Sequence, residues 1–90
     1  MALPPEHVIA KALGHPLRAQ ILAALDGREA SPKQLSDQFD VDLGNMAYHV
    51  TQLERDGLLK LTRTVPRRGA LEHFYTATVR ARIEVEDLGR

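Results

Sequence analysis

The chain has no cysteine and no tryptophan, few aromatic residues and no long apolar run. Without cysteine it can form neither a disulfide nor a thiolate metal site. Its apolar runs are far too short to span a bilayer. The opening residues, with two prolines and a glutamate, lack the charged-then-apolar order of a secretory leader. We therefore expect a cytoplasmic protein with no membrane partner.

Motifs for catalysis and cofactor binding are also missing. The sequence contains no Gly-rich phosphate loop, no nucleophile motif and no credible pair of carboxylates. Four histidines are present, but none shows a ligand spacing such as i,i+4 with another. They are His7, His15, His49 and His73. We expect no enzymatic activity, no cofactor and no metal.

Ninety residues fit one small domain, here residues 1–90. A domain of this size buries only about 60–65% of the surface that its unfolded chain exposes, so a lone monomer would be marginally stable. Since no disulfide can supplement the core, we expect the chain to form oligomers.

The net charge is zero, with 12 basic and 12 acidic residues, which argues mildly against binding nucleic acid by bulk electrostatics. The distribution is uneven. Residues 60–82 contain six basic residues and one acidic residue, a net of +5, whereas residues 1–45 contain four basic and six acidic, a net of −2. Five of those six basic residues are arginines, whose planar guanidinium matches phosphate oxygens. A solvated hairpin surface is the alternative interpretation.

Apolar periodicity and capping residues predict four helices. The first begins near Pro4 and ends at Gly14-His15-Pro16, and the second ends at Gly27. Ser31-Pro32-Lys33-Gln34 is a capping box that opens a third helix, in which Leu35 and Phe39 form the buried pair. Asp42 is a competent N-cap for the fourth helix, predicted over 43–56. Its inward residues are Met46, Val50 and Leu53.

Two alternating segments, 59–65 and 71–75, flank the turn Pro66-Arg67-Arg68-Gly69 and predict a β-hairpin. The fold class is therefore mainly α (α+β), a winged helix-turn-helix of four helices plus a two-stranded hairpin wing. Residues 79–86 alternate apolar and charged, which favours a C-terminal strand; a short helix or a frayed end is the alternative. Antiparallel pairing of two such tails would place Arg80 opposite Glu86 and Arg82 opposite Glu84.

A helix-turn-helix places the N-terminal part of its second helix in the major groove. Asn45 can pair with adenine, and Leu43 and Ala47 can contact thymine methyls. The wing, residues 66–70, would lie along the backbone or enter a minor groove. The residues that we expect to contact DNA are Lys33, Gln34, Leu43, Gly44, Asn45, Ala47, Tyr48, His49, Arg63, Arg67 and Arg68.

Each of these residues also has a structural interpretation. Leu43 could pack against its own helix, Tyr48 could pack on the hairpin, and Gly44 could be only a weak point of the helix. The alternative function is a winged helix used for protein interaction or dimerisation without specific DNA binding. An unknown small-molecule effector is a third option, although no cluster of polar residues indicates a pocket for one.

Three segments in order resemble the ArsR-type winged-helix transcription regulators. They are LGHPLRAQILAAL at 13–25, AYHVTQLERDGLL at 47–59 and RRGALEHFYTAT at 67–78. The resemblance implies a homodimeric repressor that binds a palindromic operator in double-stranded DNA. It also implies dimerisation through the first and last elements, residues 4–13 and 79–90. The expected dimer residues are Val8, Ile9, Ala12, Val79, Ala81, Ile83 and Val85.

The chain departs from that family in several places. Members often carry hydroxyl residues where this chain has Gly44 and Ala47, so two DNA hydrogen bonds are missing. Asp40 and Asp42 add negative charge close to the groove. The cysteine pair of metal-sensing members is replaced by Gln34-Leu35-Ser36. These departures predict a lower affinity for DNA and no metal trigger of the usual kind.

Overall fold

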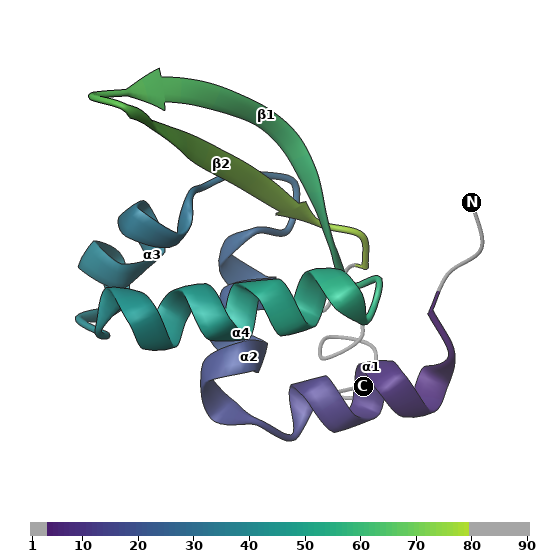
Figure 1. The fold of residues 1–90 in the computed structure, drawn as a ribbon. Helices are drawn as coiled ribbons and strands as arrows, with labels where there is room; N and C mark the ends of the chain where they lie inside the picture. Colours follow the sequence, from purple (N-terminus) through teal and green to yellow (C-terminus); the bar gives the residue numbers. More distant parts are fainter. Residues whose placement is uncertain (1–3, 80–90) are drawn as a thin grey trace.

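The computed structural model describes residues 4–79, which form four helices followed by a two-stranded antiparallel hairpin (Figure 1). This order confirms the predicted winged helix-turn-helix. The tail predicted as a strand or short helix lies outside the described residues, except for Val79. The elements are α1 (Glu6–Leu13), α2 (Pro16–Ala24), α3 (Pro32–Phe39), α4 (Leu43–Arg55), β1 (Leu59–Arg67) and β2 (Ala70–Ala77).

The predicted caps set the helix boundaries. The Ser31 hydroxyl accepts from the backbone N–H of Gln34 at 3.2 Å, and the Gln34 side chain accepts from the backbone N–H of Ser31 at 3.1 Å. Asp42 accepts from the backbone N–H of Asn45 at 2.9 Å and so caps α4. Each contact satisfies a backbone donor that has no partner inside its helix. The two helices of the helix-turn-helix therefore begin where local chemistry predicts.

One apolar core joins α2, α3, α4 and the start of the hairpin. The inward residues expected on α4, Met46, Val50 and Leu53, are all buried in it, as is Leu35 on α3. Phe39 is only half-buried and packs against the edge of this core. No helix within residues 4–79 is long and apolar enough to cross a membrane.

The hairpin turn is tighter than predicted. Arg67 pairs directly with Ala70, which leaves only Arg68 and Gly69 in the loop, rather than the four residues 66–69. Both loop residues have positive φ, 42° and 84° respectively, as in the type I′ turns that match the twist of paired strands. Pro66 is accommodated within β1 because each strand of a two-stranded sheet has a free edge that needs no backbone donor.

The base of the hairpin is tied to the loop between α2 and α3. Ala30 and Tyr75 exchange two backbone hydrogen bonds, of 2.9 and 3.1 Å. The backbone N–H of Ala77 donates to the carbonyl of Leu25 at 3.0 Å. In Figure 1, α4 runs between the hairpin on one side and α1 and α2 on the other. The wing thus has a fixed root and a projecting tip.

Candidate nucleic-acid interface

The two faces of α4 differ sharply. One face is buried against the core, while the N-terminal half of the other face is open to solvent. Leu43 is 46% exposed and Tyr48 is 57% exposed, so both side chains are accessible to a partner. Gly44 and Asn45 are exposed beside them. Four of the predicted contact residues therefore share one accessible surface.

His49 is not part of that surface, and the expectation that it faces outward is wrong. It is only 9% exposed and faces α2, where Arg18 Nε donates to its Nδ1 at 3.1 Å. Its ring centroid lies 4.8 Å from that of His15. Burial first, and then the charges of Arg18 and His15, hold the pKa of His49 below its usual value. His49 therefore packs between α2 and the Tyr48 ring, whose centroid lies 5.4 Å away, and does not face outward.

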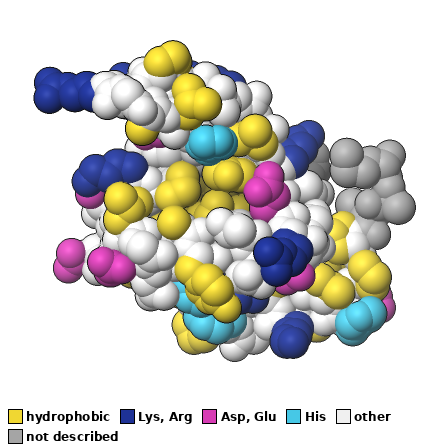
Figure 2. Space-filling model, viewed as in Figure 1, with side chains coloured by type: hydrophobic (Ala, Val, Ile, Leu, Met, Phe, Trp, Pro, Cys, Tyr) yellow, Lys and Arg dark blue, Asp and Glu magenta, His cyan; other side chains and the backbone are white. Residues whose placement is uncertain are grey.

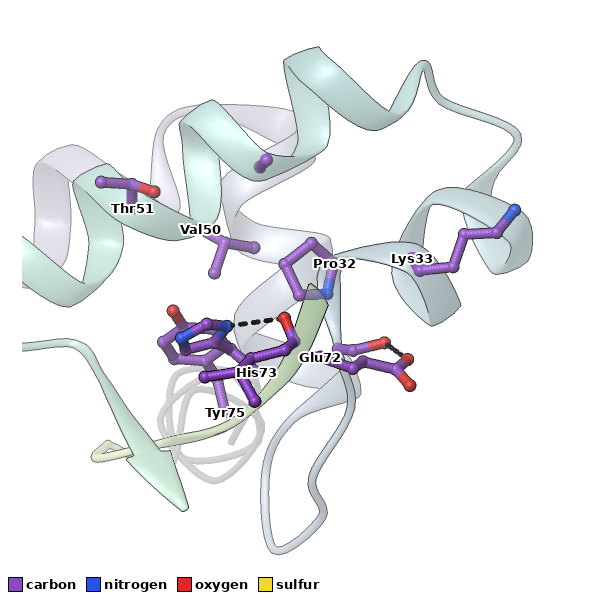
Figure 3. Close-up of a pocket in the computed structure, with 10 residues that line it drawn as sticks. Pro32, Lys33, Val50, Thr51, Glu72, His73 and Tyr75 are labelled. Atoms are coloured by element: carbon purple, nitrogen blue, oxygen red, sulfur yellow. Dashed lines mark hydrogen bonds between the residues drawn. The ribbon is translucent and has the colours of Figure 1, made fainter. Parts of the chain in front are cut away.

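Ala47 is half-buried and lines a groove between α4, the start of α3 and β2. The groove has a volume of about 300 Å³. Figure 3 shows that Val50 points into it from α4, with Tyr75 and His73 opposite from β2. A thymine methyl could reach Ala47 only at the edge of this groove. Its ten lining residues are Ser31, Pro32, Lys33, Ala47, Val50, Thr51, Leu71, Glu72, His73 and Tyr75.

The start of α3 offers less than expected. Lys33 is exposed but pairs with Asp37, one turn along the same helix, at 3.0 Å. Its amine points away from the groove (Figure 3). The side-chain oxygen of Gln34 is occupied by the cap at Ser31. An exposed i,i+4 pair is weak and exchanges easily, so Lys33 can still turn to a phosphate.

The wing arginines are not equivalent. Arg63 Nε donates to Glu29 at 2.6 Å, and its guanidinium lies 4.1 Å from the centroid of the Phe74 ring. Arg67 Nε donates to Glu72 at 2.9 Å. Arg68 lies in the turn, and within residues 4–79 it makes no ion pair. Basic side chains project from the hairpin tip in Figure 2.

Sequence analysis identified neither glutamate partner: Glu29 is 34 residues from Arg63, and Glu72 meets Arg67 only through the register of the hairpin. The hydroxyl of Thr62 and then the guanidinium of Arg63 hold the pKa of Glu29 below its usual value. The hydroxyl of Ser31 and then the guanidinium of Arg67 do the same for Glu72. Each carboxylate therefore stays ionised at neutral pH and offsets one wing arginine. The sequence alone shows only that Glu29 lies 34 residues from Arg63 and that Glu72 lies 5 residues from Arg67.

The expected dimer residues fall into three groups. Val8 and Ile9 on α1 are half-buried and pack against the edge of the core. Ala12 and Val79, at 3% and 8% exposure, are already buried within their own chain. Ala81, Ile83 and Val85 lie outside the described residues. Among the predicted residues of the described chain, Val8 and Ile9 retain the surface that a partner could cover.

No three His, Asp or Glu side chains come together in a metal-binding group within residues 4–79. His15 and His49 are close, but the Nδ1 atoms of both accept hydrogen bonds from Arg18, one from its backbone N–H and one from its side chain. The candidate interface therefore consists of the exposed face of α4, the groove beside it and the basic tip of the hairpin.

A family model described as a helix-turn-helix domain matches residues 13–62, more than half of the chain. No curated protein matches. Among solved structures, HlyU from Vibrio cholerae N16961 is 29% identical with a TM-score of 0.68, over 93% of this chain and 87% of that one. The transcriptional repressor BigR from Xylella fastidiosa is 23% identical, with a TM-score of 0.73 over 91% and 80%.

A third similar structure is the homodimeric winged helix-turn-helix DNA-binding domain Mb0332 from Mycobacterium bovis, described as a possible ArsR-family regulator. It is 21% identical with a TM-score of 0.70, and the match covers 92% of this chain and 76% of that one. At this identity the similarity is one of fold.

Proposed function

The chain belongs to the helix-turn-helix domain family and has the fold of the ArsR-type winged-helix transcription regulators, and from this we propose that it binds duplex DNA as a homodimeric repressor. That family and fold are those of DNA-binding regulators, which are not enzymes. One observation carries the proposal. The N-terminal half of α4 is exposed, while its opposite face is locked into the core.

We assign base reading to this exposed surface. Asn45 is exposed in the first turn of α4 and can make the bidentate pair that identifies adenine. Leu43 is positioned for a thymine methyl. Tyr48, one turn further along the exposed side, can reach a phosphate or a base edge. Side chains at the start of the recognition helix are those that meet base edges in this class of motif.

Backbone contact falls to the wing tip and the start of α3. Arg68 projects from the hairpin turn with no ion pair in the described part of the chain. Lys33 can exchange its exposed intrahelical pair for a phosphate. Such contacts position a protein on the duplex and carry no direct sequence information. Asp42 adds little repulsion there because its carboxylate is engaged by the start of α4.

A dimer follows from the small core and from the half-buried Val8 and Ile9 on α1. The similar Mb0332 domain is described as homodimeric. Two copies related by a two-fold axis would place their α4 helices in successive major grooves on one face of the DNA, about 34 Å apart. The operator would then be an inverted repeat.

A protein-interaction module is the second candidate, favoured by two observations. Leu43 and Tyr48 are both exposed apolar side chains on α4, and such side chains also occur at protein interfaces. The net charge is zero, and Asp40 lies exposed in the turn before α4. Both candidates use the same surface, so a binding experiment separates them better than inspection of the surface does.

The deciding experiment selects the purified protein against a random duplex-DNA library at physiological salt. We expect an inverted repeat, and replacing Asn45 with alanine should relax the preference at one position of each half-site. A fold-preserving control is Gln38→Ala, which changes an exposed residue of α3 that has no part in the proposed DNA contact. Recovery of no sequence above background would reject DNA reading and favour the protein-interaction candidate.

A further inference from the structure

Glu72 joins the wing to the start of the helix-turn-helix. Its Oε2 accepts from the Ser31 hydroxyl at 2.5 Å, and its Oε1 accepts from Arg67 Nε at 2.9 Å. Ser31 is the N-cap of α3 and is completely buried, whereas Arg67 is 63% exposed near the hairpin tip. Figure 3 shows the contact of Glu72 with the Ser31 hydroxyl at the edge of the groove. One carboxylate thus connects a fixed point to a projecting arginine.

Of the two contacts of Glu72, the one with Ser31 is fixed in place and the one with Arg67 is not. The Glu72 side chain is 18% exposed, and its first partner cannot move because the Ser31 oxygen also caps α3. The Glu72 side chain is only partly exposed, so moving Arg67 away would leave its carboxylate without its charged partner, which is unfavourable. Arg67 is therefore held more strongly by Glu72 than an arginine is held in a fully exposed ion pair.

We propose that Glu72 limits the number of phosphates that the wing contacts, by holding Arg67 and leaving Arg68 as the turn arginine that meets the DNA backbone. This inference rests on the proposed DNA binding. An arginine that approaches a phosphate alone releases condensed counterions from the DNA. An arginine that arrives with its carboxylate brings no net charge and releases few. Glu72 therefore lowers the sequence-independent part of the affinity by about one phosphate contact.

Glu29 supplies a matched comparison on the same hairpin. It also accepts from an arginine of β1 and from a hydroxyl, those of Arg63 and Thr62. Arg63, however, has a second partner, because its guanidinium lies over the Phe74 ring. Loss of Glu29 removes the same unit of negative charge but leaves its arginine held by the ring. If the salt dependence responded only to net charge, replacing Glu29 and replacing Glu72 should change it equally.

The test measures the affinity for a duplex as a function of salt for the whole chain and its variants. Glu72→Gln is isosteric and can still accept from the Ser31 hydroxyl, so it should fold. We expect the slope of log affinity against log salt to steepen by about 0.9, which is one added phosphate contact. Arg67→Ala in the Glu72→Gln background should restore the original slope. Glu29→Gln should change the slope much less.

Two results would overturn the proposal. One is an unchanged slope in Glu72→Gln, and the other is an equal steepening in Glu72→Gln and Glu29→Gln, which would assign the effect to net charge. Arg68→Ala distinguishes these from failure of the proposed function. It should reduce the slope by about 0.9 in wild type and in Glu72→Gln alike. If wild type shows no salt-dependent binding at all, DNA binding itself is rejected.

A second measurement needs no variant. The Arg67 Nε–H should give a slowly exchanging NMR resonance in the free protein because it donates to a shielded carboxylate. We expect that resonance to persist with little shift in the DNA complex. Its loss or a large shift on binding would show that Arg67 leaves Glu72 for the DNA and would contradict the proposal.

Discussion

Arg18 Nε donates a hydrogen bond to His49 Nδ1 across 3.1 Å, and this contact joins α2 to the back of the recognition helix. The bond requires an unprotonated Nδ1, so His49 is neutral in the folded chain. Protonation would place a second positive charge against Arg18 and beside His15. The orientation of α4 thus depends in part on a histidine that must stay uncharged.

The first prediction concerns acid stability. Burial, with Arg18 and His15, lowers the pKa of His49, so below about pH 6.5 the unfolded chain binds more protons than the folded one. The free energy of unfolding should therefore fall as the pH is lowered below 6.5. In His49→Gln, whose side-chain oxygen can accept from Arg18, this part of the loss should disappear. Thermal unfolding between pH 7.5 and 5.5 measures it.

His7→Gln is the matched control, because His7 is exposed on α1. It should follow the wild-type pH profile. A second loss of stability belongs to lower pH, since Glu29 and Glu72 have lowered pKa values and lose their contribution only as the pH falls below about 4.5. An identical profile for His49→Gln and wild type between pH 7.5 and 5.5 would remove His49 as the cause.

The second prediction compares the two helix caps. Ser31 and Asp42 both cap a helix of the helix-turn-helix, but Ser31 is also a buried donor to Glu72. Asp42→Ala should cost about 1 kcal/mol, the usual value for a lost cap. Ser31→Ala should cost more than this, because it removes both the cap of α3 and the hydroxyl that donates to Glu72. Chemical denaturation measures both. Equal losses would mean that the contact with Glu72 contributes nothing to stability.

Local chemistry explains which parts of this fold were predictable. The caps at Ser31 and Asp42, and the inward residues of α4, are encoded within a few positions of one another and were confirmed. His49 shares the i, i+3, i+4, i+7 spacing of Met46, Val50 and Leu53, so periodicity places it inward, and it was misplaced because a polar residue in that stripe was assigned to the surface. Its partner Arg18 is 31 residues away. The pairing of Arg63 with Glu29 likewise depends on tertiary contact across 34 residues, which no local pattern encodes, whereas that of Arg67 with Glu72 depends on the exact register of the hairpin.

The third prediction separates reading from positioning. Asn45→Ala should relax the preference at one position of each half-site by about 1–3 kcal/mol and leave the other positions unchanged. Arg68→Ala should weaken all duplexes by a similar factor. Competition binding against a set of single-base variants of the selected operator measures both. If the two variants gave the same sequence-independent loss, the division between α4 and the wing would be wrong.

The last prediction concerns the conformation of Arg68. Its φ of 42° lies in the left-handed region that a long side chain rarely adopts, and it precedes Gly69 at 84°. Asn-Gly is the favoured pair for such a type I′ turn. Arg68→Asn should therefore stabilise the chain by about 1 kcal/mol, or roughly 4–8 °C, while weakening DNA binding for every sequence. Arg68→Lys, which keeps both the charge and the unfavourable φ, should retain most binding and gain no stability. A more stable Arg68→Asn that bound DNA normally would show that the turn holds its arginine for some reason other than phosphate contact. A variant that lost affinity and gained stability would show that the wing tip retains a strained residue for the sake of binding.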